Sequence, residues 1–469
     1  MKLKKLLFFI FPYLSIFLLV SILFLTNVKK NTYFSGWDNL HPEFNFAEYA
    51  KRIVFGAWVE HQGLGAPAAQ SQLSELSRLP IIFFLSIFLP KNLIRYIFHF
   101  LMLFLGAVGM FLFLKKMWVK DENIIRKKFL SLFGAFYYLL NIFTLQQFYI
   151  SFELFAVQFA FLPFNLIAIY NFINNKTKKN FILLIISQFL FTPTAHTPTV
   201  FYISFIFFLL FAFFIIWEKY KNLTLFLKNG LSFSLIIFFV HSYWIIPNIY
   251  YILFKSNYVT ESRANYLFNQ ESKWSVIEAG DIKSLISGVH YLFTWKDFNF
   301  NTRKYELIFK EWINHFSNPL ILFFLIIFNI FSLFGIFYTL IKKEIGKIRF
   351  SILIFHVFAL IFLWSGLFLP TKLINFFYAS SIIKESFRNP FTKLQIVFSF
   401  TTTLLLITTI EFIGKKIHKA LAYWLSGFLF ILLTITYYPS FKGQFINEKL
   451  KTNIPQEYFE AYDFFQKQD

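Results

Sequence analysis

Residues 6–26 read LLFFIFPYLSIFLLVSILFLT, and the polar stretch SGWDNLHPEFN follows at residues 35–45. At about 1.5 Å per helical residue, the apolar run is long enough to cross a hydrocarbon core of roughly 30 Å. A cleavable signal peptide is the alternative, but no small-residue cleavage site follows the run. We therefore interpret it as a transmembrane span that starts in the cytoplasm and delivers the polar stretch to the extracytoplasmic side.

The composition of the whole chain is that of a membrane protein. Of the 469 residues, 57% are hydrophobic and 15% are charged, and the mean hydropathy is +0.58. A soluble domain with this balance would expose large apolar patches and aggregate. The predicted fold class is therefore an all-α polytopic membrane protein. The sequence has no cysteine, which excludes disulfides, thiolate metal ligands and a cysteine nucleophile.

Further apolar runs bring the predicted number of transmembrane helices to about eleven. The runs lie at residues 6–26, 93–114, 129–145, 154–173, 181–191, 200–216, 230–254, 319–341, 350–369, 391–413 and 421–438. The short loops between them carry lysine and arginine and alternate to one side, which is the positive-inside pattern. The net charge of +21 therefore lies mostly in cytoplasmic loops, and no nucleic-acid partner is expected. The protein is predicted to be integral to a plasma membrane.

The long polar segments define the domain organisation. Residues 27–79, 255–318 and 370–389 are predicted to share the extracytoplasmic side with the C-terminus. Residues 1–438 would then form one transmembrane domain. Residues 439–469 look like the start of an extracytoplasmic domain, and we expect the chain to be a fragment of a longer protein.

One of the apolar runs is too short to span the membrane. Residues 181–191 cover only about half of the bilayer, and TPTAHTPT follows at 192–199 before the apolar run 200–216. Irregular backbone survives below the membrane surface only where it is buried in protein or lines a wet cavity. This pattern predicts a broken helix pair around a cavity. Residues 44–61 and 80–89 predict short helices at the membrane surface.

Asp38 is the leading candidate for a catalytic residue. A carboxylate can act as a general base on a hydroxyl when partial burial raises its pKa. Asn39, His41 and Glu43 follow closely and could orient the acceptor or share the proton. The alternative is that Asp38 caps the surface helix that follows, a common role for aspartate. The residue types alone favour both roles equally.

Arg388 and Lys393 are candidates for binding a lipid phosphate at the outer end of a span, the arginine by bidentate bonds and the lysine as a point charge. The alternatives are a headgroup anchor or, for Arg388, a surface pair with Glu385. His196 is a third candidate, although its residue type and position favour a structural histidine with a satisfied hydrogen bond. Other polar residues near the outer boundary are better explained as headgroup contacts or helix caps: Arg95, His99, Glu153, Glu60 and His61. The chain has no GxxxxGK[ST] phosphate loop and no HExxH zinc pair.

The chain resembles the GT-C class of integral membrane glycosyltransferases, and more narrowly the arabinofuranosyltransferase group and the related YfhO-type membrane proteins. The likeness covers the whole chain in topology and is specific in two short stretches. These are Gly36-Trp37-Asp38 through Trp58-x-Glu60-x-Gln62-Gly63-Leu64-Gly65, and Phe387-Arg388-Asn389-Pro390-x-x-Lys393.

The resemblance implies a sugar donor on polyprenyl phosphate and an extracytoplasmic glycan or lipid acceptor, together with membrane lipid. It also implies that Asp38 is the catalytic base, and that Arg388, with Lys393 or His196, holds the departing phosphate during an inverting transfer. Many members have a second acidic residue where this chain has Asn39, and this difference argues against assistance by a metal ion. We therefore expect no cofactor, with a divalent cation as the alternative. Two other classes remain: a lipid or glycan transporter or flippase, and a cell-envelope assembly protein.

Overall fold

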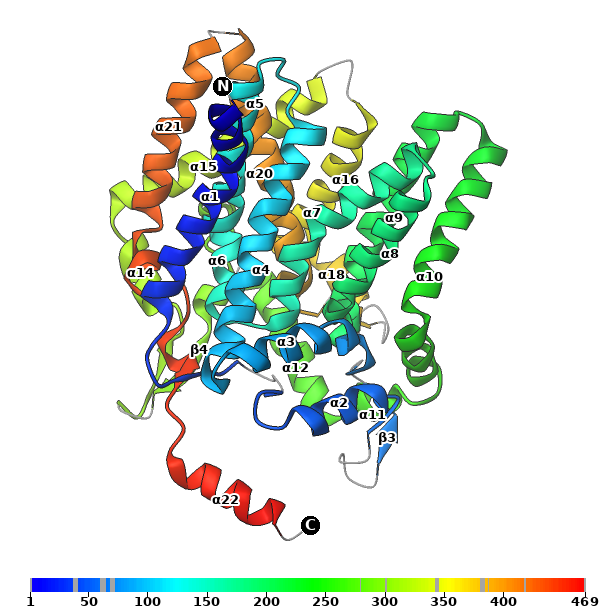
Figure 1. Ribbon diagram of the computed structural model, residues 1–469, viewed down its shortest axis with the longest axis vertical. Coiled ribbons are helices and arrows are strands. Elements are labelled where there is room, and N and C mark those ends of the chain that lie inside the picture. Colours follow the sequence, from blue (N-terminus) through cyan, green and yellow to red (C-terminus); the bar gives the residue numbers. More distant parts are fainter. Residues whose placement is uncertain are drawn as a thin grey trace.

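The computed structural model describes residues 2–36, 41–59, 65–67, 72–278, 280–299, 302–341, 346–379, 384–386, 388–416 and 419–467. Long helices stand side by side in a bundle (Figure 1). We call the lower end of the bundle in Figure 1, which carries α2, α3, α12 and β4, the loop end. The connections at the opposite end are short, and most of the short helices and strands lie at the loop end.

Seven helices among the described residues are long and apolar enough to cross a membrane, or eight if the bent pair α5–α6 is one span. The seven are α1 (Lys2–Asn27), α4 (Lys91–Phe113), α7 (Glu153–Asn174), α9 (Pro198–Tyr220), α10 (Leu223–Phe254), α15 (Pro319–Ile341) and α20 (Pro390–Lys416). The bent pair is α5 (Ile124–Leu140) and α6 (Ile142–Tyr149). The other predicted runs form the shorter helices α8 (Lys178–Phe191), α16 (Lys347–Leu363) and α21 (Lys419–Thr436). The all-α polytopic membrane fold agrees with the prediction, and the count of eleven spans stays a prediction.

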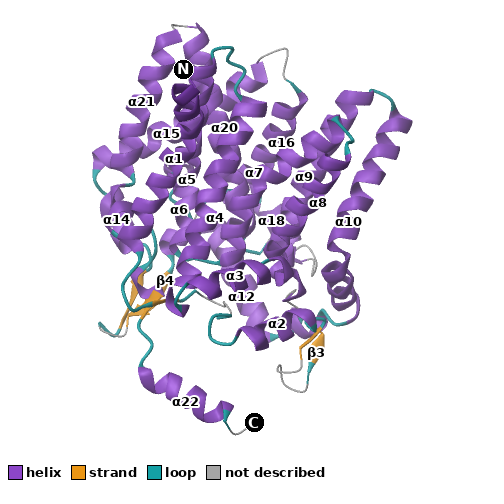
Figure 2. Cartoon of the chain, in the orientation of Figure 1, coloured by secondary structure: helices purple, strands orange, loops and turns teal. Residues whose placement is uncertain are grey.

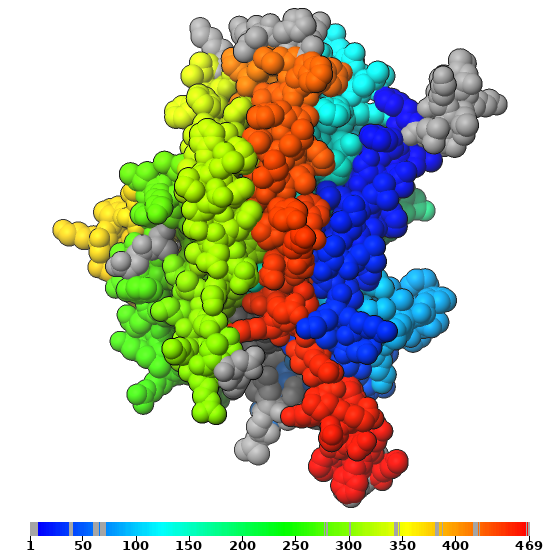
Figure 3. Space-filling model, turned by 90° about the vertical axis from the view of Figure 1, so that its left-hand side faces the viewer, coloured from blue at the N-terminus to red at the C-terminus, as the bar shows by residue number. Residues whose placement is uncertain are grey.

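Three of the long helices form the centre of the bundle. The most apolar stretch of α20 is 89% buried, and those of α7 and α4 are 78% and 67% buried, against 17% for α10. Lipid supplies no hydrophobic drive between helices, so small residues at the contacts matter. Gly335 on α15 is one example, because a Cβ there would lie 2.2 Å from the backbone oxygen of Leu405 on α20. On one outer face of the bundle, α21 lies between α1 and α15 (Figure 3).

The polar segments fold into short helices and two-stranded antiparallel sheets, and the strands drawn in Figure 2 all lie at the loop end. The sheets are β1 (Tyr33–Phe34) with β6 (Lys451–Thr452), β2 (Trp58–Val59) with β3 (Ala66–Pro67), and β4 (Lys296–Asn299) with β5 (Lys304–Leu307). The short α-helices are α2 (Phe46–Val54), α3 (Leu79–Phe88), α11 (Asn257–Thr260), α12 (Arg263–Glu278), α13 (Ile282–Ser287), α14 (Lys310–Phe316), α17 (Ser365–Phe368), α18 (Thr371–Ala379) and α22 (Gln456–Gln466). The short 3₁₀ helices are η1 (Gln72–Ser77), η3 (Thr192–His196), η4 (Tyr291–Thr294), η5 (Tyr438–Lys442) and η6 (Glu448–Leu450). The segment η2 (Leu114–Trp118) is a π-helical turn. The surface helices predicted at 44–61 and 80–89 correspond to α2 and α3.

Asn27 joins the first polar segment to the end of the chain. It is the last residue of α1 and is fully buried. Its Nδ2 donates to the Ser440 carbonyl at 2.8 Å, and its Oδ1 accepts from the backbone N–H groups of Phe445 at 2.8 Å and Ile446 at 3.2 Å. Together with the β1–β6 pairing, these bonds make the first and last extramembrane segments one structural unit.

A buried asparagine also forms the break between α5 and α6, where the axis bends by 42°. The Oδ1 of Asn141 accepts from the backbone N–H groups of Phe143 and Thr144, both at 3.0 Å. Its Nδ2 donates to the Tyr137 carbonyl at 3.0 Å and to Ser399 Oγ on α20 at 2.7 Å. One side chain therefore satisfies the backbone at both helix ends and fixes the break to the central helix.

Candidate functional site

A cavity of about 840 Å³ opens among the segments of the loop end. Its wall is built from the α6–α7 turn, the junction of η3 and α9, one face of α12, the segment η4–β4, and the start of α20. The lining mixes aromatic side chains with charged and hydroxyl groups. Both His196 and Arg388, which the sequence selects from distant positions, line this single cavity. Its volume lies within the usual range for small-molecule sites.

Arg388 is held by α12 and by its own turn. Its Nη1 donates to Asn265 Oδ1 on α12 and lies 3.4 Å from Glu385 Oε2. Glu385 in turn accepts from the side-chain amides of Asn265 at 2.7 Å and Asn269 at 3.0 Å. The pair with Glu385 that the sequence allows is present. The Arg388 side chain remains 30% exposed, so it lines the cavity while its charge is only partly balanced.

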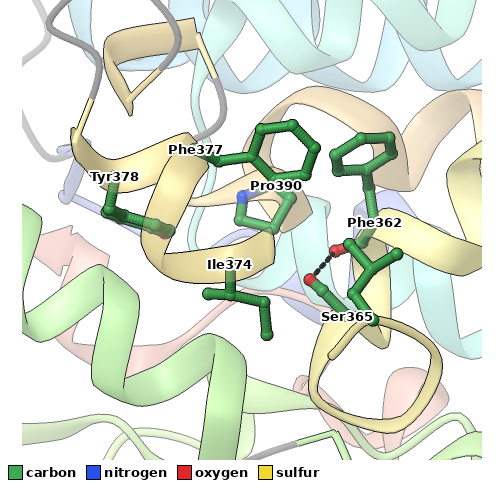
Figure 4. A pocket seen from close by; sticks show the side chains of 7 residues that line it. Phe362, Ser365, Ile374, Phe377, Tyr378 and Pro390 are labelled. Atoms are coloured by element: carbon green, nitrogen blue, oxygen red, sulfur yellow. Dashed lines mark hydrogen bonds between the residues drawn. The ribbon is translucent and has the colours of Figure 1, made fainter. Parts of the chain in front are cut away.

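The turn after Arg388 is fixed by backbone geometry. Asn389 has a φ of +50°, in the left-handed region that asparagine tolerates better than most residues. Its N–H donates to Ser272 Oγ on α12 at 2.8 Å. Pro390 then starts α20 and lines a pocket of about 20 Å³ with Phe377 and Tyr378 (Figure 4). That pocket has room for about one water, so it serves packing of the turn and not ligand binding.

Lys393 lies behind the cavity wall. It is buried, and its Nζ donates to the backbone carbonyl of Glu385 at 3.2 Å and to that of Arg388. Lysine has three donors, and these bonds tie the segment before α20 to its first turn. The structure therefore places Lys393 where it supports the position of Arg388, and the direct phosphate contact predicted for it stays a prediction.

His196 ends η3, the break that the sequence predicts between α8 and α9. The break is buried against η1 from the first polar segment, where Thr192 Oγ1 donates to the Ser74 carbonyl at 2.9 Å. The Nδ1 of His196 lies 3.4 Å from Glu75 Oε1 on η1, close enough for an ion pair when the ring is protonated but without hydrogen-bond geometry. The irregular backbone at this depth is thus covered by protein on one side and lines the cavity on the other.

Glu75 belongs to a buried set of charges. Its Oε2 lies 3.1 Å from Arg78 Nη1 and accepts from the Tyr49 hydroxyl at 3.3 Å. Burial is the largest single effect on the Arg78 guanidinium and lowers its pKa, but Glu75, Tyr49 and the more distant carboxylates together outweigh burial, so the pKa is raised overall. Glu43 and Glu153 act on Arg78 in the same direction. Burial also raises the pKa of Tyr49, which keeps the phenol neutral.

His41 and Glu43 lie beside a second buried ion pair, Arg95 with Glu153. The Nε of Arg95 donates to Glu153 Oε1 at 2.7 Å, and its Nη1 lies 3.2 Å from each of the two ring nitrogens of His41. His41 Nδ1 lies 2.9 Å from Glu43 Oε1. These contacts favour the tautomer in which Nδ1–H donates to Glu43 and Nε2 accepts from Arg95. The segment that includes His41 is therefore fixed to the ends of α4 and α7.

Two expectations from the sequence are wrong. Arg95, His99 and Glu153 are not headgroup contacts or caps, because each is buried: Arg95 pairs with Glu153, and His99 Nε2 lies 3.2 Å from Ser151 Oγ. The side chain that caps α2 is Asn45, which accepts from the Glu48 N–H at 3.0 Å, so the capping role allowed for Asp38 belongs to another residue. Several residues that the sequence analysis names lie outside the described residues. They are the candidate or boundary residues Asp38, Asn39, Glu60 and His61, and Trp37, Gln62, Gly63, Leu64 and Phe387 of the two stretches that carry the resemblance.

The sequence analysis missed the wall contributed by α12 and η4. Glu271 and Trp274 of α12 line the cavity, as do Tyr291 and Trp295. The Tyr291 hydroxyl donates to Glu271 Oε1 at 3.4 Å. The available signal was the spacing of three to four residues within 263–278, which places one set of side chains on each helix face. The described residues contain no group of three His, Asp or Glu side chains placed to hold a metal ion.

Comparison with known proteins adds no relative: no protein-family model and no curated protein matches this chain.

Proposed function

We propose that this chain is a membrane glycosyltransferase of the GT-C class, similar to the arabinofuranosyltransferase and YfhO-type group, which transfers a sugar from a polyprenyl-phosphate donor. The observation that carries the proposal is the shared cavity of about 840 Å³, which combines the partly exposed guanidinium of Arg388 with His196 and several aromatic side chains. A phosphate needs cationic donors, a sugar needs polar and aromatic partners, and a lipid chain needs an apolar approach.

The roles of the residues follow from the charges that develop in the reaction. The acceptor hydroxyl attacks the anomeric carbon with inversion, its proton passes to Asp38, and the bond to the lipid phosphate breaks. Negative charge grows on the departing phosphate, where Arg388 stabilises it and His196 donates a hydrogen bond. Lys393 positions Arg388 through the backbone of its turn. Asn39, His41 and Glu43 orient the acceptor side.

In this proposal the protein is integral to the plasma membrane. Its N-terminus lies in the cytoplasm, and the loop end is extracytoplasmic. The chain then crosses the membrane eleven times, with α8, α16 and α21 as the shorter spans. A lipid-linked donor suits this location because nucleotide sugars are not available outside the cytoplasm. The acceptor is a glycan or a lipid of the cell envelope, and no metal is assigned.

The test is transfer of radiolabelled sugar from a panel of polyprenyl-phosphate donors to membrane extracts. Asp38→Asn keeps the shape of the side chain and removes the base, so turnover should fall by about 10² to 10⁴. Arg388→Gln should lower turnover as well. Arg303→Gln is the matched control, because Arg303 is exposed in the β4–β5 turn. Wild-type turnover that Asp38→Asn leaves unchanged would reject Asp38 as the base.

Ionisable side chains within the spans favour a second candidate, a lipid transporter without bond chemistry. Arg95, His241 and His356 are buried in α4, α10 and α16, and such groups often line transport paths. The transporter would move a labelled polyprenyl-phosphate sugar across proteoliposomes without releasing the lipid phosphate. Release of lipid phosphate only when acceptor is present would exclude this candidate.

A further inference from the structure

We infer that one wall of the cavity is a carbohydrate-binding subsite for a neutral sugar, formed by Glu271, Trp274, Tyr291 and Trp295. This inference rests on the proposed function, because it names the sugar class that the same cavity accepts. The four subsite residues are different from the cationic residues that line the same cavity, Arg388, His196 and Lys296, so variants of the subsite measure its own contribution to binding.

The first observation is the placement of two side chains on α12. Glu271 and Trp274 are three residues apart, so they share one face of the helix, and that face lines the cavity. Trp274 is 60% exposed although it lies at the cavity wall. An indole exposed in a cavity offers its flat face to the C–H face of a sugar ring, and a nearby carboxylate accepts hydrogen bonds from sugar hydroxyls.

The second observation is a rigid group of aromatic rings. The Tyr291 and Trp295 rings lie 5.6 Å apart at 85°, and Trp295 meets Phe391 at 5.8 Å and 88°. The Tyr291 and Phe391 rings are 4.9 Å apart. Such edge-to-face contacts hold each ring in place before a ligand arrives, so less entropy is lost on binding.

The third observation is that the ring group and Arg388 belong to one segment of the cavity wall. Phe391 follows Arg388 by three residues, and both line the cavity. The ring group is therefore attached to the segment that presents the guanidinium. A molecule with an anionic phosphate beside a sugar ring matches this order: charge at Arg388, ring at Trp295 and hydroxyl groups at Glu271.

Glu271 also determines which sugars are excluded. The Tyr291 hydroxyl donates to its Oε1 at 3.4 Å, which leaves further acceptor positions on the carboxylate for a ligand. A sugar that carries its own carboxylate would meet like charge at this position. The subsite should therefore prefer a neutral sugar to a uronic acid.

The test measures binding to the purified chain in lipid nanodiscs by calorimetry, so it requires no catalytic activity. The probes are farnesyl phosphodiesters. Four of them have equal charge: one carries a methyl group, and three carry glucose, mannose or arabinofuranose. The fifth carries glucuronate, whose carboxylate adds one negative charge. We expect at least one neutral sugar diester to bind about tenfold more tightly than the methyl diester, as stacking and one charged hydrogen bond imply. We expect the glucuronate diester to bind more weakly than the glucose diester.

Trp295→Ala and Glu271→Gln should each remove most of the sugar preference and leave methyl-diester affinity unchanged within about twofold, which also shows that the variants fold. Trp295→Phe should keep the preference. Tyr266→Ala is the matched control, because Tyr266 is an exposed aromatic residue on α12 outside the cavity lining.

The possible results separate the subsite from the proposed function. Equal binding of the methyl diester and all three neutral sugar diesters would overturn the subsite and leave phosphate binding intact. A preference that survives in both Trp295→Ala and Glu271→Gln would overturn the assignment of these residues. If no diester binds, the subsite and the proposed donor are both rejected.

Discussion

Asn141→Ala should destabilise the protein much more than the same change at Asn123, although both asparagines cap helices in the same way. Asn123 is the N-cap residue that precedes α5, and its Oδ1 accepts from the N–H groups of Ile125 at 3.0 Å and Arg126 at 3.1 Å. Asn141 makes the equivalent bonds at the start of α6. The difference is burial, because Asn123 is exposed and Asn141 is fully buried.

The expected magnitudes follow from what replaces the lost acceptor. At Asn123 water can bond to the two N–H groups, so the change should cost about 1 kcal/mol, the usual value for an exposed cap. At Asn141 the two N–H groups stay unsatisfied inside the bundle, at about 1–3 kcal/mol each. The Tyr137 carbonyl loses its bond to the side chain but still accepts from the backbone N–H of residue 141, so it adds little to the loss in unfolding free energy. We expect a total of roughly 3 kcal/mol for Asn141→Ala.

Both variants can be compared by unfolding in mixed micelles with increasing denaturing detergent, followed by tryptophan fluorescence. The quantity of interest is the difference between the two losses in unfolding free energy, which we expect to be about 2 kcal/mol. Equal losses for the two variants would mean that the α5–α6 break is hydrated, and the reasoning from burial would be refuted.

Three further predictions concern other buried contacts. Asn27→Ala should expose the segment after α21 to protease, because three hydrogen bonds to it are lost. Gly335→Ala should lower the melting temperature by several degrees, since a Cβ would meet backbone at 2.2 Å, whereas Gly427→Ala, with open space around it, should not. Burial lowers the pKa of His290 from 6.5 to about 4. The unfolded ring binds its proton at higher pH, so stability should fall by up to about 3 kcal/mol between pH 6.5 and 4, and His290→Gln should reduce this loss in melting curves.

The helices were predictable because lipid imposes a simple rule. Every backbone polar group must be satisfied inside the membrane, so long apolar runs form helices whatever their neighbours are. The same rule identified the break at residues 192–199, which forms η3. It did not identify the break at Asn141, because residues 129–145 read as one continuous apolar run. The decisive bonds to Ser399 join residues far apart in the sequence, which no local pattern reveals.

The candidate site was predictable only in part. Arg388 and His196 carried a local signal, since each is a polar residue at the end or break of an apolar run. Glu271 and Trp274 carried only a helical spacing, which does not single them out, because segment 255–318 contains many charged and aromatic residues and only folding places α12 beside the start of α20. The pairing of Arg95 with Glu153 was hidden for the same reason: the partners come from different helices.

Burial explains why Arg388, and not Arg95 or Arg78, is suited to a ligand. Arg95 and Arg78 are 3% and 5% exposed, and each is paired with a buried carboxylate, Glu153 or Glu75. Their charges are already balanced inside the protein, and removing either partner would leave a buried charge unpaired. Arg388 is 30% exposed, and its carboxylate partner Glu385 lies at 3.4 Å. A phosphate in the cavity can therefore approach Arg388 without breaking a buried ion pair, whereas at Arg95 or Arg78 it would have to displace a carboxylate that the fold requires.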